Sequence, residues 1–448
     1  MFNLKNFKID NLIIKKLLYI FFFYSIFEGC LRKWLFPNYY NVLFFLKDFL
    51  LLFIYIAAIN NKYLFKNKIE IFTYSIAFLI SLYGIIGFYK NLDYFSDIFY
   101  SFILGIRSYW IYLPLTFLIY NLFKIEDFQK FIKINLYLVF PYFFLIILQT
   151  IFAPTSIINS GLNSLVMNPE RPSGFFTYTT QNTYYLVFLY LCFQSYILFN
   201  KILSKQHLLY ILILNSLLVI ILILLKSRAV YFFILIIFFT SLISIFFLKE
   251  NKIQKLKKFL IIFLSTIFFF IVFSKLFAKQ FEFSKNRINT DTYYEMVFVK
   301  NFGHKKIFST SIYKFCENNS SICRVIDTLY FPVKNINITG AGIGAGTSTV
   351  STYLNKNKLY LGENENHRLI AEIGILGGIL IYFKFFFVLF MLIIFLKRRD
   401  FRTAPLLAFV CVLTLVLNMT YSSSFSSLVY WVCVGNLLAL LRKETVVS

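Results

Sequence analysis

Residues 207–248 read HLLYILILNSLLVIILILLKSRAVYFFILIIFFTSLISIFFL, two apolar runs separated by the tripeptide Lys226-Ser227-Arg228. A run of about 20 apolar residues has the length that an α-helix needs to cross the hydrocarbon core of a bilayer. A helix also satisfies its own backbone hydrogen bonds, which lipid cannot do for it. The stretch therefore predicts two membrane-spanning helices, at 207–225 and 229–248, joined by a very short hairpin.

The composition of the whole chain agrees with this interpretation. Of the 448 residues, 59% are hydrophobic, 21% are aromatic and 15% are charged, and the mean hydropathy is +0.72. Soluble domains are about half apolar and about a quarter charged. This chain has too little polar material to cover a soluble core. A soluble enzyme is therefore excluded, and a polytopic membrane protein is predicted.

Ten further apolar runs have the length of a membrane span. They cover residues 17–36, 42–60, 70–88, 98–120, 131–153, 182–200, 258–277, 367–396, 403–419 and 424–441. The predicted fold class is thus all-α, a polytopic membrane helix bundle of about 12 transmembrane helices. Residues 1–277 hold spans 1 to 9, residues 278–366 form a large extracytoplasmic loop between spans 9 and 10, and residues 367–448 hold spans 10 to 12.

Basic residues predict how the bundle is oriented. About half of the 45 lysines and arginines lie on alternate short segments, which include the N-terminus, residues 62–68, 249–258 and 397–402. Short loops rich in lysine and arginine stay in the cytoplasm. We therefore expect both termini to be cytoplasmic and the 278–366 loop to face outward. These loops account for the net charge of +25, so we expect contact with membrane lipids and no nucleic acid partner.

Two arginines are predicted at the outer boundary of the bundle. Arg171 lies in the turn Asn168-Pro169-Glu170-Arg171-Pro172-Ser173-Gly174, and Arg228 lies on the short hairpin. A guanidinium suits bidentate contact with phosphate or diphosphate. The alternative for Arg171 is an interfacial side chain that reaches phospholipid headgroups. The alternative for Arg228 is an anchor that flanks a span.

A denser polar stretch precedes the tenth span. Glu363, Glu365, His367 and Arg368 lie within six residues, and Glu372-Ile373-Gly374 follows. A lipid boundary does not require so many polar groups, although a solvated loop end is an alternative interpretation. Glu363 and Glu365 have no further evident metal ligands nearby. We therefore predict no metal site.

Three other features carry weaker signals. Arg107 lies inside an apolar span, so it should face a polar cavity or a partner, and Lys47 and Asp48 in the second span could pair across the bundle. The stretch Gly340–Thr347 has glycine at every second position, which allows close approach to a ligand or to another helix. Cys316 and Cys323 lie on the outer loop, where a local disulfide is compatible with an oxidising compartment.

The order of these motifs resembles the O-antigen polymerase and O-antigen ligase superfamily. The motifs are Arg171-x-x-Gly174-Phe175, Ser227-Arg228, the glycine-rich stretch, and a polar cluster followed by Glu372-x-Gly374-x-x-Gly377. Residues 27–34, FEGCLRKW, are similar to exopolysaccharide members. The resemblance implies a GT-C glycosyltransferase of a bacterial inner membrane. Such enzymes move a glycan from undecaprenyl diphosphate to an acceptor hydroxyl in the periplasm, without nucleotide sugar, metal or other cofactor.

The resemblance also implies roles for individual residues. Arg171 and Arg228 take the places of the loop and hairpin arginines. Ligases carry His-Asn nine residues before the glutamate of the last motif, whereas Glu363-Asn364 stands here. This departure favours a polymerase, with Glu363 orienting the acceptor or taking its proton.

The other candidates have subordinate roles in this interpretation. His367 is the alternative base, because its ordinary pKa of about 6.5 suits proton transfer. Arg368, Arg107 and Glu365 would contact phosphate or sugar. The alternative functions are a ligase that transfers glycan to a lipid or protein acceptor, and a flippase or transporter of lipid-linked oligosaccharides. Implied partners are the undecaprenyl-diphosphate-linked oligosaccharide and a chain-length regulator or other polysaccharide assembly proteins.

The topology can be tested by cysteine accessibility. In a variant without the native cysteines, Lys252→Cys should resist a membrane-impermeant thiol reagent in spheroplasts, whereas Asn319→Cys should react. Both sites should react once the membrane is permeabilised. Labelling of the Lys252→Cys variant in sealed spheroplasts would overturn the predicted orientation.

Overall fold

The computed structural model describes residues 10–91, 94–153, 155–159, 171–177, 179–199, 205–247, 252–278, 338–345, 365–398, 401–416 and 424–442. All regular structure in these residues is helical. Cys316 and Cys323 lie outside the described residues, as does most of the 278–366 loop.

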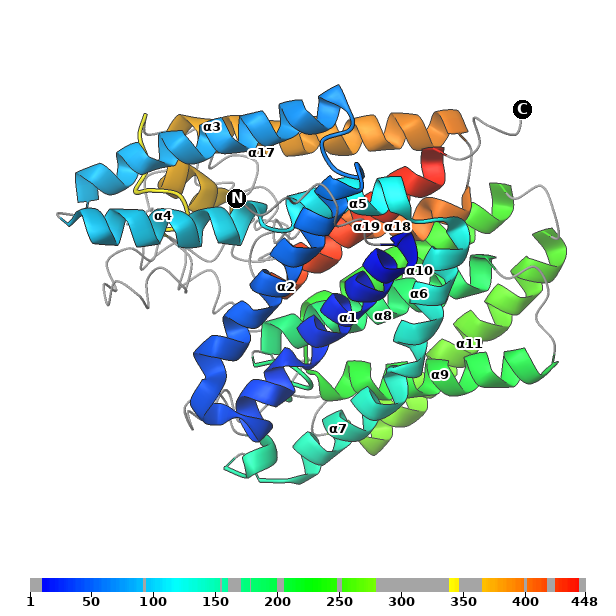
Figure 1. Cartoon of the computed structure of the whole chain (residues 1–448). Helices are drawn as coiled ribbons and strands as arrows, with labels where there is room; N and C mark the ends of the chain where they lie inside the picture. The colour runs from blue at the N-terminus through cyan, green and yellow to red at the C-terminus, as the bar shows by residue number, and fades with distance from the viewer. Residues whose placement is uncertain are drawn as a thin grey trace, which may run out of the picture.

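Figure 1 labels the main helices in chain order. They are α1 (Asn11–Cys30), α2 (Tyr40–Asn60), α3 (Lys68–Asn91), α4 (Phe95–Trp110), α5 (Leu113–Leu122), α6 (Ile125–Tyr137), α7 (Val139–Ile151), α8 (Thr179–Phe199), α9 (Lys205–Leu224), α10 (Arg228–Phe247), α11 (Lys252–Leu276), α17 (Glu365–Arg398), α18 (Ala404–Cys411) and α19 (Ser424–Arg442). The shorter elements are η2 (Leu31–Leu35), η3 (Pro37–Tyr39), η4 (Ile157–Asn159), η9 (Phe401–Thr403) and η10 (Val412–Val416).

Many of these helices are long and apolar enough to cross a membrane. In the described part of the chain there are eight such segments: Pro37–Asn60, Lys68–Lys90, Phe95–Leu122, Ile125–Ile151, Gln206–Leu224, Lys252–Leu276, Arg368–Lys397 and Ser424–Leu441. Phe233–Phe247 and Ala404–Thr414 are shorter apolar helices. The prediction of an all-α, multi-pass membrane bundle is thus confirmed, while the count of about 12 spans stays a prediction.

Two predicted spans are each built from two helices. The span predicted at 98–120 is interrupted between α4 and α5, where Pro114 lies in the first turn of α5. The span predicted at 131–153 is interrupted at Leu138, between α6 and α7. Proline lacks the amide hydrogen that continues a helix, so it is tolerated where a new helix begins.

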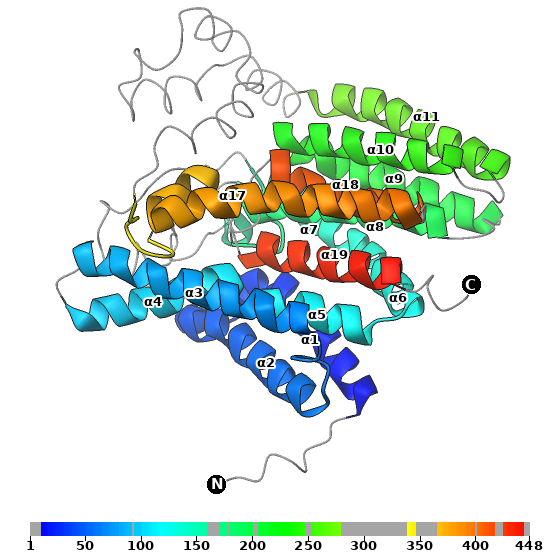
Figure 2. The same cartoon turned by 90° about the horizontal axis from the view of Figure 1, so that it is seen from above.

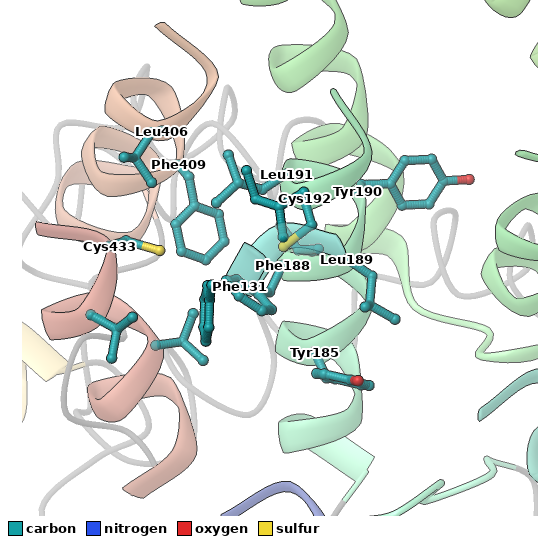
Figure 3. Packing of buried hydrophobic residues seen from close by; sticks show 14 of the residues in the cluster. Phe131, Tyr185, Phe188, Leu189, Tyr190, Leu191, Cys192, Leu406, Phe409 and Cys433 are labelled. Carbon is teal, nitrogen blue, oxygen red and sulfur yellow. The ribbon is translucent and has the colours of Figure 1, made fainter. Parts of the chain in front are cut away.

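Helix α8 lies at the centre of the bundle. Every residue from Tyr184 to Phe199 is buried, as expected for a helix with neighbours on all sides. Figure 3 shows Phe188 of α8 near Phe131 of α6 and Phe409 of α18, and the ring centroids lie 5.9 Å and 6.4 Å from that of Phe188. Figures 1 and 2 show α9, α10 and α11 together at one edge of the bundle, away from α2.

Loops predicted on the same side of the membrane meet at the same end of the bundle. At the predicted inner end, Lys15 pairs with Asp127 at 2.6 Å, and Asn121 donates to the carbonyl of Tyr63. At the predicted outer end, Trp34 donates to the carbonyl of Ile157, and Lys90 donates to Thr339. These contacts therefore agree with the prediction that successive loops lie alternately at the inner and the outer end of the bundle.

The glycine-rich stretch packs against helices at the predicted outer end. A Cβ atom added to Gly105 of α4 would lie 2.1 Å from the carbonyl oxygen of Ile343. One added to Gly87 of α3 would lie 2.4 Å from the amide nitrogen of Gly342. Gly342 has φ of 117°, a conformation that glycine adopts most easily. Of the two expected uses of these glycines, the structure shows close approach to helices.

Helix α17 is bent near its start. Ile373 and Gly374 have non-helical backbone angles, and Gly374 has φ of 57°. A Cβ atom added to Gly377 would lie 2.2 Å from the carbonyl oxygen of Leu369, so the first two turns fold back beside the rest of the helix. Figure 2 shows this short arm next to α3 and the 338–345 stretch. The bend places Glu372 beside the glycine-rich stretch, where its carbonyl accepts from the amide of Gly342 and its side chain from the amide of Gly344.

The contact at Gly105 predicts a stability effect. Gly105→Ala should lower the free energy of unfolding by about 1 to 3 kcal/mol, because backbone atoms of Ile343 must move to admit the methyl group. Thermal unfolding of the detergent-purified protein measures this loss. Ser96→Ala, at an exposed position of the same helix, is the control and should change little. A Gly105→Ala variant as stable as the wild type would contradict the described packing.

Candidate functional site

Five charged side chains gather where α1, η2, α2 and α4 meet; we call this group (Glu28, Arg32, Lys47, Asp48 and Arg107) the charged cluster. Glu28 accepts from Arg32 at 2.9 Å and from Lys47 at 2.6 Å. Asp48 pairs with Arg107. All five side chains are at most 11% exposed. Since neighbouring residues on a helix point about 100° apart, Lys47 faces α1 and Asp48 faces α4.

The three cations of the charged cluster surround one aromatic ring. The Phe44 centroid lies 4.8 Å from Arg32 Cζ, 4.8 Å from Lys47 Nζ and 4.1 Å from Arg107 Cζ. The ring offers its negative face to such cations. Among the described residues, Glu28 and Asp48 are the carboxylates that pair with these cations, so the formal charge of the charged cluster is one positive unit. Its buried atoms without a hydrogen-bond partner in the described structure are Arg32 Nε, Arg107 Nη2 and Asp48 Oδ1.

The turn that carries Arg171 is held against η2. Lys33 donates to Ser173 Oγ at 2.9 Å and to the Gly174 carbonyl at 3.1 Å. Gln149 accepts from the amide of Gly174 at 2.8 Å, which fixes the turn against α7. Gly174 has φ of 58°, which explains glycine at this position. Arg171 is half-buried, and its Nε is a buried atom that has no hydrogen-bond partner in the described part of the chain.

The Arg171 turn borders the charged cluster through shared neighbours. Lys33, which donates to Ser173 and Gly174 of the turn, directly follows Arg32 in η2. Ser424, at the start of α19, lies 3.3 Å from Lys47 Nζ. The next residue, Phe425, packs on Phe176 of the turn with centroids 4.6 Å apart. The Arg171 turn at the predicted outer end thus adjoins a charged cluster that extends toward the middle of α2.

A second polar group centres on Glu372 in α17. Its Oε2 accepts from the Tyr109 hydroxyl at 2.6 Å and from the Gly344 amide at 2.7 Å. Its Oε1 lies 3.4 Å from Arg368 Nε. Glu372 is fully buried. Tyr109 follows Arg107 by two residues, so α4 directs these two side chains to nearly opposite faces and lies between the two polar groups.

The predicted site residues occupy several places. Arg107 lies in the charged cluster, Arg171 lies on the adjoining turn, and Arg368 lies beside Glu372. Arg228 begins α10, but its side chain is outside the description, as are the side chains of Glu365 and His367 in the first turn of α17. Glu363 lies outside the described residues. The described contacts therefore divide Arg107 and Arg368 between two groups.

Several residues of these groups were not predicted as site residues. Glu28, Arg32 and Lys33 stood in the quoted stretch FEGCLRKW, where charges inside an otherwise apolar run were an available signal. Tyr109 offered no signal, because its role depends on Glu372 of a distant helix. Within the described residues, no three potential metal ligands gather.

The Glu372 contacts predict a large stability effect. Glu372→Ala should lower the free energy of unfolding by about 3 to 5 kcal/mol, because it removes a buried carboxylate that Arg368, Tyr109 and Gly344 share. Unfolding by heat in detergent measures the change. Glu126→Ala removes an exposed carboxylate at the predicted inner end and should cost less than about 0.5 kcal/mol. Equal effects of the two substitutions would contradict the role of Glu372.

Comparison with known proteins identified no relative of this chain. No protein-family model, no curated protein and no solved structure matches the chain. A functional assignment for this protein therefore rests on its own residues and on the geometry described above.

Proposed function

We propose that the protein is a polymerase of undecaprenyl-diphosphate-linked oligosaccharide repeat units in a bacterial inner membrane. It would transfer the growing glycan to an acceptor sugar hydroxyl at the outer face. One observation carries the proposal: Arg171, whose buried Nε has no partner among the described residues, lies on a turn held by Lys33 and Gln149 beside a charged cluster with excess positive charge. Fixed positive charge at a membrane boundary is what a diphosphate leaving group requires.

The proposal includes twelve membrane passes with both termini in the cytoplasm. The eight long apolar segments supply eight passes, and α1, α8, α10 and α18 with η10 supply four more. Loops that are predicted on the same side of the membrane contact each other at the same end of the bundle. This arrangement supports twelve passes, because each pass then runs from one end of the bundle to the other. The distribution of lysine and arginine supports the orientation.

The proposed reaction is a displacement at an anomeric carbon. The acceptor hydroxyl oxygen forms the new glycosidic bond, the bond from the anomeric carbon to the diphosphate oxygen breaks, and the diphosphate leaves with the electron pair. Arg171 and Arg228 bind the departing diphosphate, with Arg107 and Arg368 as further contacts. Glu363 takes the hydroxyl proton or orients the acceptor, His367 is the second candidate base, and Glu365 binds sugar. No metal or cofactor enters this scheme.

The alternative functions make different demands on the polar groups. A flippase or other transporter needs them near the membrane midplane, accessible in turn from both sides. The Arg171 turn lies at the predicted outer end, whereas Lys47 and Asp48 are the eighth and ninth of the 21 residues of α2 and lie near the middle of that helix. The position of the Arg171 turn favours a transferase, and the position of the charged cluster does not distinguish the two functions. A ligase would use the same donor, and Glu363 in the register of the ligase histidine favours the polymerase.

Arg171 gives the direct test of the proposed chemistry. Arg171→Ala should reduce glycan elongation about 100-fold or more, because the developing diphosphate charge loses a fixed partner. Arg171→Lys keeps the charge without the planar fork, so it should restore elongation only in part. The measurement is the glycan length profile of cells that accumulate equal amounts of each variant in the membrane.

Lys16→Ala is the matched control, since it removes an exposed cation from α1 at the predicted inner end. It should leave the length profile unchanged. Normal elongation in the Arg171→Ala variant would contradict the proposal. In a deletion strain, loss of long chains fits a polymerase, whereas full-length untransferred glycan would indicate a ligase and cytoplasm-facing intermediates a flippase.

A further inference from the structure

We infer that the charged cluster is itself a binding site for a phosphate-bearing lipid, with the diphosphate of the polyprenyl carrier as the ligand. Arg32 of η2, Lys47 of α2 and Arg107 of α4 would contact its oxygens. This inference rests on the proposed function for the identity of the lipid. It adds Arg32 and Lys47, on the N-terminal helices, to the diphosphate contact already proposed for Arg107.

The charge balance of the cluster indicates an absent anion. Three cationic groups lie within 5 Å of one ring centroid, and two carboxylates face them. A cluster that served only to join helices would be expected to balance its charges, because an uncompensated buried charge is strongly unfavourable. One further negative group bound at the cluster would neutralise the excess.

The open hydrogen-bonding positions indicate the shape of that anion. Within the described residues, Arg32 Nε and Arg107 Nη2 are buried donors without a partner, and they come from two different elements. Asp48 Oδ1 is a buried acceptor that also has no partner there, so the anion must approach from the side of the arginines. Buried donors are nearly always paired, so such groups need an explanation. A phosphate or diphosphate presents several oxygens in different directions and can accept from both arginines at once. Guanidinium groups are well suited to that contact.

The position of the cluster gives the lipid a route to it. Phe45 is exposed, and its ring centroid lies 5.3 Å from Arg107 Cζ. The charged cluster therefore reaches the edge of the α2 face that is exposed at the surface of the bundle. That face is apolar and exposed at Val42, Leu46 and Phe49. A prenyl chain could lie along this face while its phosphate groups reach the arginines.

The ion pair between Asp48 and Arg107 allows a test with two opposite expectations. Asp48→Asn and Arg107→Gln break the same ion pair, so a purely structural role predicts similar defects in both. The first raises the net charge of the cluster by one and the second lowers it by one. The apparent Kd of farnesyl diphosphate is measured for purified protein in phosphatidylcholine nanodiscs. Arg107→Gln should weaken binding about tenfold or more, while Asp48→Asn should leave it equal or tighter.

The matched control is the ion pair at the predicted inner end. Lys15→Gln, which breaks the pair with Asp127, should leave the Kd unchanged. Farnesol, which lacks phosphate, should not compete. Competition by phosphatidylglycerol as strong as that by farnesyl diphosphate would replace the carrier with a phospholipid headgroup and overturn the assignment. Equal weakening in the Asp48→Asn and Arg107→Gln variants, or no binding by the wild type, would overturn the site itself.

If either variant fails to fold, Glu28→Gln and Arg32→Gln repeat the test, because both break the ion pair between Glu28 and Arg32 and change the charge in opposite directions. Glu28→Gln also breaks the pair with Lys47, so a purely structural role predicts the larger defect in Glu28→Gln, whereas anion binding predicts it in Arg32→Gln. Binding is measured without turnover, so the two proposals can fail separately. Diphosphate binding without glycan elongation would contradict the polymerase and retain the site. Glycan elongation by a wild-type protein that does not bind the diphosphate at the charged cluster would support the polymerase and contradict the site.

Discussion

Charge inside a membrane bundle is the constraint on which the other features of this structure depend. Moving an isolated carboxylate or ammonium group into a medium of low dielectric constant costs on the order of 20 kcal/mol in the idealised limit. Glu28 and Asp48 must therefore meet cations, and they find Arg32, Lys47 and Arg107. These pairs bring α1, η2, α2 and α4 together in one arrangement. Because α4 is fixed in this way, Tyr109 on its other face can meet Glu372, which in turn binds the amide of Gly344.

Arg171 at the predicted outer end and the charged cluster beside it connect this framework to the proposed chemistry. The Arg171 turn is held by Lys33 and Gln149, so its guanidinium starts from a fixed backbone and little reorganisation is needed when charge develops. The charged cluster borders the turn through Ser424 and Phe425. A lipid-linked substrate could thus bind its diphosphate among groups whose positive charge the protein has already assembled, while its prenyl chain stays in the membrane.

The sequence was informative wherever the deciding interactions are local. The runs at 207–225 and 229–248 correspond to α9 and α10 within a few residues, because the length of an apolar run and a short polar hairpin determine both helices. The interruption between α4 and α5 was missed, although Pro114 was visible. Arg107 was predicted to face a partner or a polar cavity, but Asp48 could not be singled out as that partner, since the pairing depends on how two helices pack. Glu363, Glu365 and His367 stay predictions, because their side chains are outside the described structure.

Reconstitution tests the central claim, that this protein extends a glycan at the expense of a lipid diphosphate bond. The purified protein is placed in liposomes with undecaprenyl-diphosphate-linked oligosaccharide as both donor and acceptor. Glycan length and free undecaprenyl diphosphate are measured over time. The account predicts longer chains, with one diphosphate lipid released for each repeat unit added and with no nucleotide sugar present. Unchanged glycan length with no release of free undecaprenyl diphosphate would contradict it.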